Sequence, residues 1–424
     1  MNFENSLAAA RKMDQEDQLR TFREEFLFPQ HDGRDVVYLT GNSLGLQPKG
    51  AADAINQELK DWHEFGVEGH FEAKNPWYAY HEMFAAPLAK VVGAKESEVV
   101  AMNGLTTNLH LLMVSFFQPK GKRVKILCEA KAFPSDLYAL KSQLRFHGIE
   151  EEDGLIALEP RKGEHTLRTE DILKAIEDNA EELALVMIGG VNYYTGQVIQ
   201  MKTVCAAAHA VGVLCGFDLA HGAGNVELKL HDWGVDFAAW CSYKYLNSGP
   251  GSVSGVFVHE RHHGTDLPRF EGWWGHDKNE RFKMGSNFKA IHSAEAWQLS
   301  NAPVLAMAVH KIALDQFMRA GMDKVRSKSL QLSSFLRYII EDTSSKNEGV
   351  EFEIITPKAD EERGSQLSIL VHGEGKAMFD HLTKNGVVAD WREPNVIRIA
   401  PVPLYNNFED CFRFGEVLQD FLDA

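Results

Sequence analysis

Between about residues 103 and 258, short apolar runs alternate with segments in which apolar residues recur every three or four positions. Continuous apolar runs of about four to eight residues are typical of strands that are buried on both faces of a sheet. The segments between these runs begin with a capping residue or an acidic first turn, as helices do. The pattern therefore predicts a largely parallel sheet covered by helices. The predicted strands are 124–129, 183–190, 213–220, 235–243 and 252–259, and the predicted helices are 135–148, 169–180 and 201–212.

After about residue 290 the pattern changes to long amphipathic helices, which are predicted at 294–321 and 322–342. The polar stretch 344–349 is predicted to be a loop. A mixture of long helices and separate short strands predicts a smaller α+β domain at the C-terminal end of the chain. The short strands of this domain are predicted at 352–356, 365–372 and 396–401.

A chain of 424 residues exceeds what one hydrophobic core usually organises. We expect a segment over 1–46 that joins the small domain, a large ligand-binding domain over 47–300, and a small α+β domain over 301–424. The first 26 residues mix charges with spaced apolar residues, which predicts an amphipathic helix rather than a signal peptide. No apolar run approaches the roughly 18 residues that a membrane span needs, so we expect a cytoplasmic protein.

The charge balance narrows the class of partner. The chain has 44 Lys and Arg residues against 60 Asp and Glu residues, a formal net charge of -16. This charge repels nucleic acids and anionic membranes, so we expect neither as a partner and instead a small-molecule ligand. The five cysteines are scattered without a C-x-x-C motif, so no disulfide framework and no metal site is predicted. We expect these cysteines to be buried apolar side chains.

Polar residues that directly follow the predicted strands are the candidates for chemistry, because ligands collect at the carboxyl ends of strands in open α/β sheets. Asp218 ends one apolar run, and His221 follows three residues later. A carboxylate in such surroundings needs a cationic partner or good hydrogen-bond donors. The alternative is that Asp218 only caps the next turn.

Lys244 interrupts the aromatic stretch WCSYKY between two predicted strands. Desolvation lowers the pKa of a buried lysine, which prepares it for Schiff-base chemistry. The alternative is a lysine that reaches solvent from the edge of the sheet. The glycines that follow are spaced G-x-G-x-x-x-G, which does not match a dinucleotide loop, so NAD binding is not predicted.

Gly104, Thr106 and Thr107 stand at the start of an apolar helical pattern. Hydroxyl groups together with the free N–H groups of a helix N-terminus can bind a phosphate. The alternative is an ordinary helix cap without a ligand.

A phosphate site, then an Asp, then a Lys 26 residues after that Asp is the order of parts in a pyridoxal-phosphate (PLP) enzyme of the aspartate-aminotransferase fold, fold type I. The Asp keeps the pyridine nitrogen protonated, and the Lys holds the cofactor as a Schiff base. An aromatic residue should stack on the ring, and Phe133 follows a predicted strand at a suitable place. We therefore predict a PLP-dependent transferase-like large domain with a mainly parallel sheet.

Seven segments that together extend from residue 38 to residue 410 resemble kynureninase. The resemblance implies PLP-dependent hydrolysis of the Cβ–Cγ bond of kynurenine or 3-hydroxykynurenine, in tryptophan degradation and on the route to NAD biosynthesis. The products would be alanine and anthranilate or 3-hydroxyanthranilate, and the enzyme would be a homodimer. The segments are YLTGNSLGLQP (38–48), MNGLTTNLHLL (102–112), AFPSD (132–136), VNYYTGQ (191–197), GFDLAHGAGNVELKLHDWGVDFAAWCSYKYLNSGPGS (216–252), GWWGH (272–276) and IRIAPVPLYNNFED (397–410).

The resemblance also implies roles for individual residues. Lys244 would hold the cofactor and carry the Cα proton, and Tyr243 is the candidate proton donor. Trp273 and Asn301 would reach the site from the partner subunit. The cofactor-binding residues would be Leu105, Thr106, Phe133, Pro134, Ser135, Asp136, Asp218, His221, Tyr243, Lys244, Trp273 and Asn301. The substrate-binding residues would be Ser43, His70, Asn301 and Arg398.

Two of these substrate residues bear on the aryl ring. His70 lies in a predicted Gly-flanked loop, and with Asn301 it resembles family members that act on 3-hydroxykynurenine. One departure from the family pattern is visible, because a position that can carry Ser is Gly189 here. One phosphate or ring contact would then be lost or replaced by a backbone N–H.

Two other functions stay open at this stage. A cysteine desulfurase would share the fold, but it needs a nucleophilic Cys on a mobile loop. Cys205, Cys215 and Cys241 fall within helix or strand patterns, and Cys411 falls in a terminal helix. A PLP-binding regulator without enzymatic activity would need a DNA-reading module or a basic patch, and the sequence offers neither.

Overall fold

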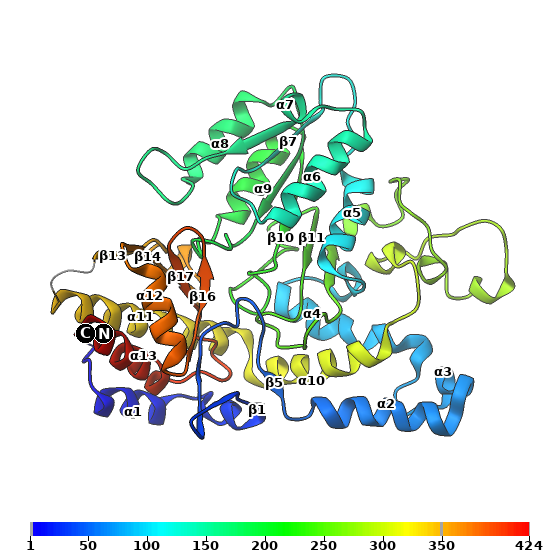
Figure 1. Cartoon of the computed structure of the whole chain (residues 1–424). Coiled ribbons are helices and arrows are strands. Elements are labelled where there is room, and N and C mark those ends of the chain that lie inside the picture. Colours follow the sequence, from blue (N-terminus) through cyan, green and yellow to red (C-terminus); the bar gives the residue numbers. More distant parts are fainter. Residues whose placement is uncertain (1–2, 348–350, 424) are drawn as a thin grey trace.

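A computed structural model describes residues 3–347 and 351–423 of the chain. Its larger part is built around a seven-stranded sheet with the strand order β6-β12-β11-β10-β9-β7-β8 (Figure 1). From β11 to β8 neighbouring strands run parallel, whereas β12 is antiparallel to both β11 and β6. The mainly parallel sheet that the sequence predicts is confirmed. The strands are β6 (Val99–Ala101), β7 (Lys125–Glu129), β8 (Leu155–Leu158), β9 (Leu183–Gly189), β10 (Leu214–Asp218), β11 (Phe237–Trp240) and β12 (Gly255–Val258).

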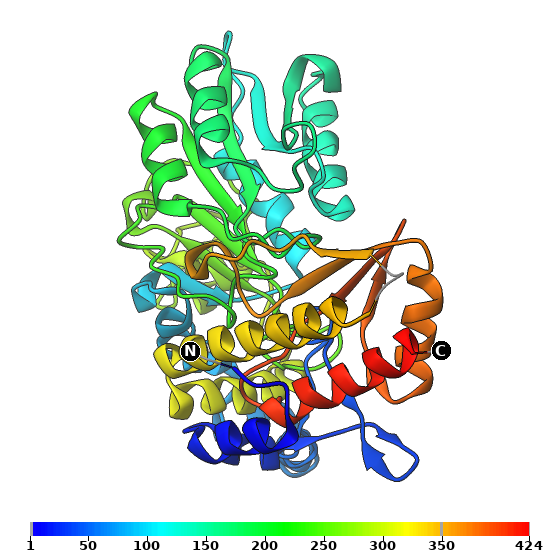
Figure 2. The same cartoon turned by 90° about the vertical axis from the view of Figure 1, so that its left-hand side faces the viewer.

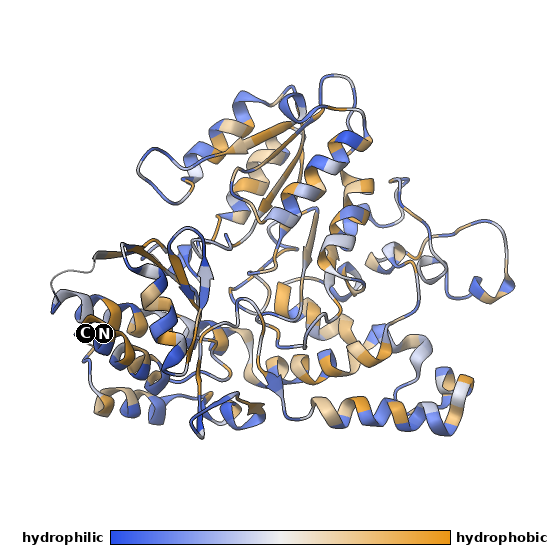
Figure 3. Ribbon diagram, viewed as in Figure 1, coloured by the Kyte–Doolittle hydropathy of each residue, from blue (hydrophilic) through white to orange (hydrophobic). Residues whose placement is uncertain are grey.

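Alternate residues of the central strands face two separate hydrophobic clusters. Leu127 and Val186 belong to one cluster, and their neighbours Ile126 and Leu185 belong to the other. Side chains alternate across a strand, so a sheet that is covered on both faces gives a continuous apolar run in the sequence. Figure 3 shows these strands as largely apolar. The covering helices are α5 (Leu105–Phe116) and α6 (Pro134–Phe146) with one cluster, and α8 (Thr169–Asp178) and α9 (Met201–Ala210) with the other.

A second, four-stranded antiparallel sheet has the order β13-β14-β17-β16. Helices from both ends of the chain pack with it around a third hydrophobic cluster. Figure 2 shows three of them together, α11 in gold, α13 in red and α1 in dark blue. The elements are α1 (Leu7–Glu16), α11 (Met322–Ser345), β13 (Glu351–Ile354), β14 (Leu367–His372), α12 (Gly375–Lys384), β16 (Asp390–Arg392), β17 (Val396–Ile399) and α13 (Phe408–Leu422).

The N-terminal segment runs along the small sheet before the chain enters the large part. Its strand β4 pairs in parallel with β15. Helix α10 packs against α2 and α4. The domain limits that we expect after residues 46 and 300 stay a prediction. The connecting elements are β1 (Phe26–Leu27), β2 (Gln30–His31), β3 (Arg34–Asp35), β4 (Val37–Tyr38), β5 (Gln47–Pro48), α2 (Ala51–Phe65), α3 (Gly69–Glu72), α4 (Ala85–Val92), α7 (Glu151–Gly154), α10 (Val304–Ala320) and β15 (Val387–Val388).

The structure corrects two predicted helices. The pattern over 294–321 is not one helix, because a short 3-10 turn ends at Trp297 and α10 begins only after Pro303. Proline has no N–H to donate and disfavours helical backbone in the residue before it, which explains the interruption. The N-terminal helix is shorter than expected, since α1 ends at Glu16. The carboxylate of Asp17, the next residue, accepts a hydrogen bond from the Leu19 N–H.

The loop predicted over 344–349 lies partly outside the described residues, and α11 continues to Ser345. In the described ranges no helix combines the length and the apolar character that crossing a bilayer would require.

Candidate active site

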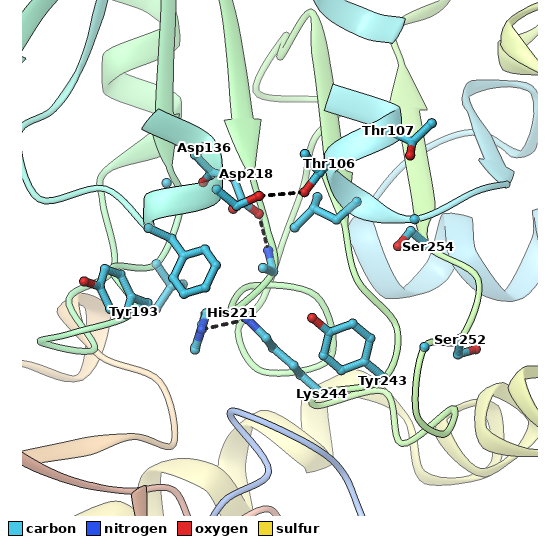
Figure 4. Close-up of a pocket in the computed structure, with 18 of the residues that line it drawn as sticks. Thr106, Thr107, Asp136, Tyr193, Asp218, His221, Tyr243, Lys244, Ser252 and Ser254 are labelled. Atoms are coloured by element: carbon cyan, nitrogen blue, oxygen red, sulfur yellow. Dashed lines mark hydrogen bonds between the residues drawn. The ribbon is translucent and has the colours of Figure 1, made fainter. Parts of the chain in front are cut away.

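The loops that follow the carboxyl ends of four parallel strands meet at one cavity of about 360 Å³ (Figure 4). Asp218 is the last residue of β10, and Tyr243 and Lys244 follow β11. The N-terminus of α5 approaches from another side. The predicted residues that line this cavity are Leu105, Thr106, Phe133, Ser135, Asp136, Asp218, His221, Tyr243 and Lys244. The local sequence places each of them at a strand end or a helix start, and the sheet brings those ends together.

Lys244 lies in contact with His221 at the centre of the cavity. Lys244 is half-buried, and its Nζ lies 3.0 Å from His221 Nε2 (Figure 4). Burial, followed by the positive charge of Lys244, holds the pKa of His221 well below its usual value. His221 is therefore neutral, and its Nε2 can accept a hydrogen bond from Lys244 Nζ. Its Nδ1 is buried without a hydrogen-bond partner in the described part of the chain.

Asp218 is buried at 8% exposure, and within the described residues no Lys or Arg forms an ion pair with it. Its Oδ1 accepts a hydrogen bond from the Ala220 N–H at 2.6 Å. This oxygen therefore caps the turn, as the alternative interpretation of Asp218 expected. Burial, then the charge of Asp218, raises the pKa of Asp136 well above its usual value. Asp136 therefore keeps a proton near neutral pH. A buried carboxylate without a cation is costly, and a protonated pyridine nitrogen is a group that fits it.

Free hydroxyls and helix N–H groups surround the opposite end of the cavity. Gly104 is the N-cap of α5 and provides no side-chain cap. Ser252 Oγ and Ser254 Oγ are buried and have no hydrogen-bond partner among the described residues. Thr106 Oγ1 lies 2.8 Å from Ser135 Oγ. Unsatisfied donors at a helix N-terminus suit a phosphate, so this end fits the phosphate group of PLP. The two serines follow Lys244 in the segment GPGSVS, and the sequence predicted a role for neither of them.

The aromatic wall of the cavity consists of Phe133 and Tyr193. Phe133 is 42% exposed, and its ring meets the Tyr193 ring edge-on with centroids 5.3 Å apart. The Lys244 Nζ lies 5.8 Å from the centre of the Phe133 ring. A flat cofactor could therefore be covered by this ring while it is attached to Lys244. Pro134 does not line the cavity, because it forms the first turn of α6, where proline is favoured.

Arg398 and Ser43 lie together but do not line this cavity. Arg398 is 1% exposed on β17, an interior strand of the small sheet, so it is not a surface arginine. Its Nη1 donates to the Tyr193 carbonyl at 2.6 Å. Its Nη2 pairs with the Asp390 carboxylate and with Ser43 Oγ. The guanidinium therefore lies behind the aromatic wall, joined to the cavity through Tyr193.

Trp273, Asn301 and His70 do not reach the Lys244 cavity of the same chain. They line a separate pocket of about 420 Å³, whose other walls are mainly aromatic. His70 is not in a loop as the flanking glycines suggested, because Gly69–Glu72 forms the short helix α3. The reason is close packing, since a Cβ at Gly69 would lie 2.5 Å from the Trp77 ring.

Comparison with known proteins gives the chain a family. The family model of the kynureninase C-terminal domain matches residues 325–418. Proteins named kynureninase from Flavobacterium psychrophilum and Flavobacterium johnsoniae are 55% and 56% identical, each covering 99% of both chains. The kynureninase of Myxococcus xanthus is 53% identical and covers 98% of this chain and 97% of its own.

Solved structures give the fold. A cysteine desulfurase from Thermococcus onnurineus superposes with a TM-score of 0.74 over 92% of this chain and 95% of its own. The Escherichia coli cysteine desulfurase CsdA gives a TM-score of 0.75 over 96% and 98%. Both are only 16% identical to this chain, so the likeness extends to the fold alone. The three kynureninases are more than 50% identical to this chain over nearly its whole length, which shows that the chain belongs to the kynureninase family.

Proposed function

We propose that this chain binds PLP at Lys244 and hydrolyses the Cβ–Cγ bond of kynurenine or 3-hydroxykynurenine. The products are alanine and anthranilate or 3-hydroxyanthranilate. The proposal rests on one cavity in a member of the kynureninase family. In this cavity Lys244 lies against neutral His221, and the buried Asp218 forms no ion pair with a described Lys or Arg. When bound, PLP supplies the electron sink for charge at Cα and Cβ.

Each residue of the cavity has a distinct task in this proposal. Asp218 would hold the proton at the pyridine nitrogen of PLP, and Phe133 would cover its ring. The N–H groups of α5, with Ser252 and Ser254, would bind the phosphate. Lys244 Nζ would take the Cα proton of the substrate, and neutral His221 would stay its hydrogen-bond acceptor.

Water then attacks the γ-carbonyl, and the aromatic acid leaves. Tyr243 lines the cavity beside Lys244, and burial raises the pKa of its phenol above the usual value. The phenol therefore keeps its proton at neutral pH and can deliver it to Cβ.

The direct test is release of fluorescent anthranilate from kynurenine by the purified, PLP-loaded chain, with cysteine as the competing substrate. A cysteine desulfurase would release sulfide from cysteine instead. All five cysteines are buried, and none of them lines the cavity. Sulfide release without anthranilate release would refute the proposal.

We further propose that the active unit is a homodimer, in which Trp273 and Asn301 of one chain reach the Lys244 cavity of the other. The support is the second pocket, which gathers exposed aromatic side chains such as Phe71 and Phe282, both 58% exposed. A contiguous exposed apolar surface of this kind marks an interface. The enzyme would act in the cytoplasm, in tryptophan degradation, with the aromatic product available for NAD biosynthesis.

Phe282→Glu is expected to give a monomer with little turnover, because a charge would be buried at the interface. Sedimentation should show twice the 47.6 kDa chain mass for the unchanged protein and a single chain for the variant. Phe146→Glu is the matched control, since Phe146 is 77% exposed on α6, outside the second pocket. A fully active monomer would contradict the shared site.

The substrate preference is expected to rest on His70 and Asn301, which are polar groups in an otherwise apolar pocket. The His70 Nδ1–H donates to the Val67 carbonyl at 2.9 Å, which leaves Nε2 as an acceptor for a substrate hydroxyl. A site built for a hydroxyl binds the unsubstituted ring less well, because its acceptor stays unpaired.

We therefore expect kcat/KM for 3-hydroxykynurenine to exceed that for kynurenine by several-fold to roughly tenfold, the scale of one neutral hydrogen bond. The double variant His70→Trp, Asn301→Thr should reduce this ratio. A preference for kynurenine in the unchanged enzyme, or an unaltered ratio in the double variant, would show that the pocket does not select in this way.

A further inference from the structure

Glu129 is a buried acid in the cofactor cavity to which the proposed reaction assigns no task. It is the last residue of β7 and is 5% exposed, and it lines the same cavity as Asp218 and Lys244. Its Oε2 accepts a hydrogen bond from Asn192 Nδ2 at 3.2 Å. Its Oε1 accepts no hydrogen bond from any described residue. Burial raises the pKa of Glu129 to about 7, so near neutral pH a large share of this carboxyl is uncharged, which limits its repulsion of Asp218.

Gly189 leaves the space that this carboxyl occupies. The residue ends β9, the strand next to β7. A Cβ at position 189 would lie 2.9 Å from Glu129 Oε1, closer than real contacts allow. Gly189 is not among the residues with left-handed backbone, so a larger residue there would meet a contact rather than backbone strain. A side chain at position 189 would therefore force the carboxyl end of Glu129 to shift from its observed place.

Through Asn192, Glu129 holds the turn that carries the aromatic wall. Asn192 Oδ1 accepts the N–H groups of Tyr194 and Thr195 and the Thr195 hydroxyl at 2.9 to 3.1 Å. Tyr193, next in the chain, packs its ring on Phe133 and offers its carbonyl to Arg398. One buried carboxyl thus connects β7 to the side chain that covers the cofactor and to the predicted carboxylate-binding arginine.

We infer that Glu129 is a positioning residue for both cofactor and substrate, and that Gly189 is glycine because Glu129 needs the space. Glu129 fixes the 192–195 turn, and the turn sets the places of Phe133 and Arg398. The inference rests on the proposed function, in which Phe133 covers the cofactor ring and Arg398 binds the substrate.

The test is a double-mutant cycle read as the dissociation constant of PLP, measured by quenching of tryptophan fluorescence. Glu129→Ala and Gly189→Ala are each expected to weaken PLP binding by several-fold to about tenfold, the scale of one hydrogen bond. The double variant should be no weaker than either single variant, because both changes remove the same contact. Glu129→Gln keeps an oxygen that Asn192 can reach, so it should bind PLP nearly as the unchanged chain does.

The matched control for the added methyl is Gly50→Ala, which meets Ile312 at 3.3 Å outside the cavity and should leave PLP binding unchanged. The KM for substrate should rise in Glu129→Ala, with a smaller change in kcat, because Arg398 loses its fixed neighbour. Multiplicative effects in the double variant, or equal losses in Glu129→Gln and Glu129→Ala, would overturn the inference. If Gly189→Ala does not fold, the comparison of these two Glu129 variants decides alone. Absence of PLP binding in the unchanged chain would instead refute the proposed function.

Discussion

Lys244→Ala is expected to lower turnover by about 10³-fold or more and to remove the visible absorbance band of the lysine-bound cofactor. The reason is that one amine has two tasks in the proposal: it anchors PLP, and it moves the Cα proton. Lys244 lies against neutral His221, and its Nζ is 5.8 Å from the centre of the Phe133 ring. Among the described residues, no other lysine lines the cavity.

Steady-state rates and absorbance spectra of the loaded proteins check this expectation. Lys202→Ala is the control, since Lys202 is exposed on α9. Borohydride fixes the cofactor to the lysine that holds it, so a peptide map locates the attachment. Recovery of the fixed cofactor on any lysine other than Lys244 would sink the assignment.

Arg398→Lys is expected to raise the KM for substrate about tenfold to a hundredfold, with a smaller effect on kcat, the scale of a lost charge-assisted hydrogen bond. The guanidinium of arginine is a planar fork. In Arg398, Nη1 donates to the Tyr193 carbonyl, and Nη2 contacts Asp390 and Ser43. A lysine ammonium keeps the charge but cannot satisfy both sides and also grip a carboxylate.

Arg392→Lys is the matched control for this prediction. Arg392 contacts the same Asp390 oxygen at 3.1 Å, but its side chain is 37% exposed, and the Tyr193 carbonyl accepts its hydrogen bond from Arg398 instead. Its KM should change little. An unchanged KM in Arg398→Lys, or an equal rise in both variants, would show that Arg398 does not bind the substrate carboxylate.

Much of the Lys244 cavity could be predicted from sequence, because its parts are local features. A buried strand reads as a continuous apolar run, and a helix start reads as small and hydroxyl residues before such a run. Asp218 at the end of β10 and Gly104 at the start of α5 could both be located in this way. Phe133 could be located from its place after the strand predicted at 124–129, the family resemblance added Tyr243, and both residues line the cavity.

Residues that act through distant partners could not be found in this way. Glu129 carries no local signal, since it looks like the polar end of a strand, and its contact with Gly189 depends on β7 and β9 being neighbours in the sheet. The Arg398 fork depends on strand register, because β16 and β17 pair Asp390 with Arg398. Register and strand order are set by packing of whole elements, which no short window of sequence contains.

The sequence by itself thus determined the element types, the order of the cofactor-binding parts along the chain and the family resemblance. Only the tertiary structure decided which strand ends share one cavity, and that His70, Trp273 and Asn301 lie in a different pocket from Lys244. The physical reason is that hydrophobic periodicity and capping are properties of neighbouring residues. The distance between side chains from different elements follows instead from how completed helices and sheets pack.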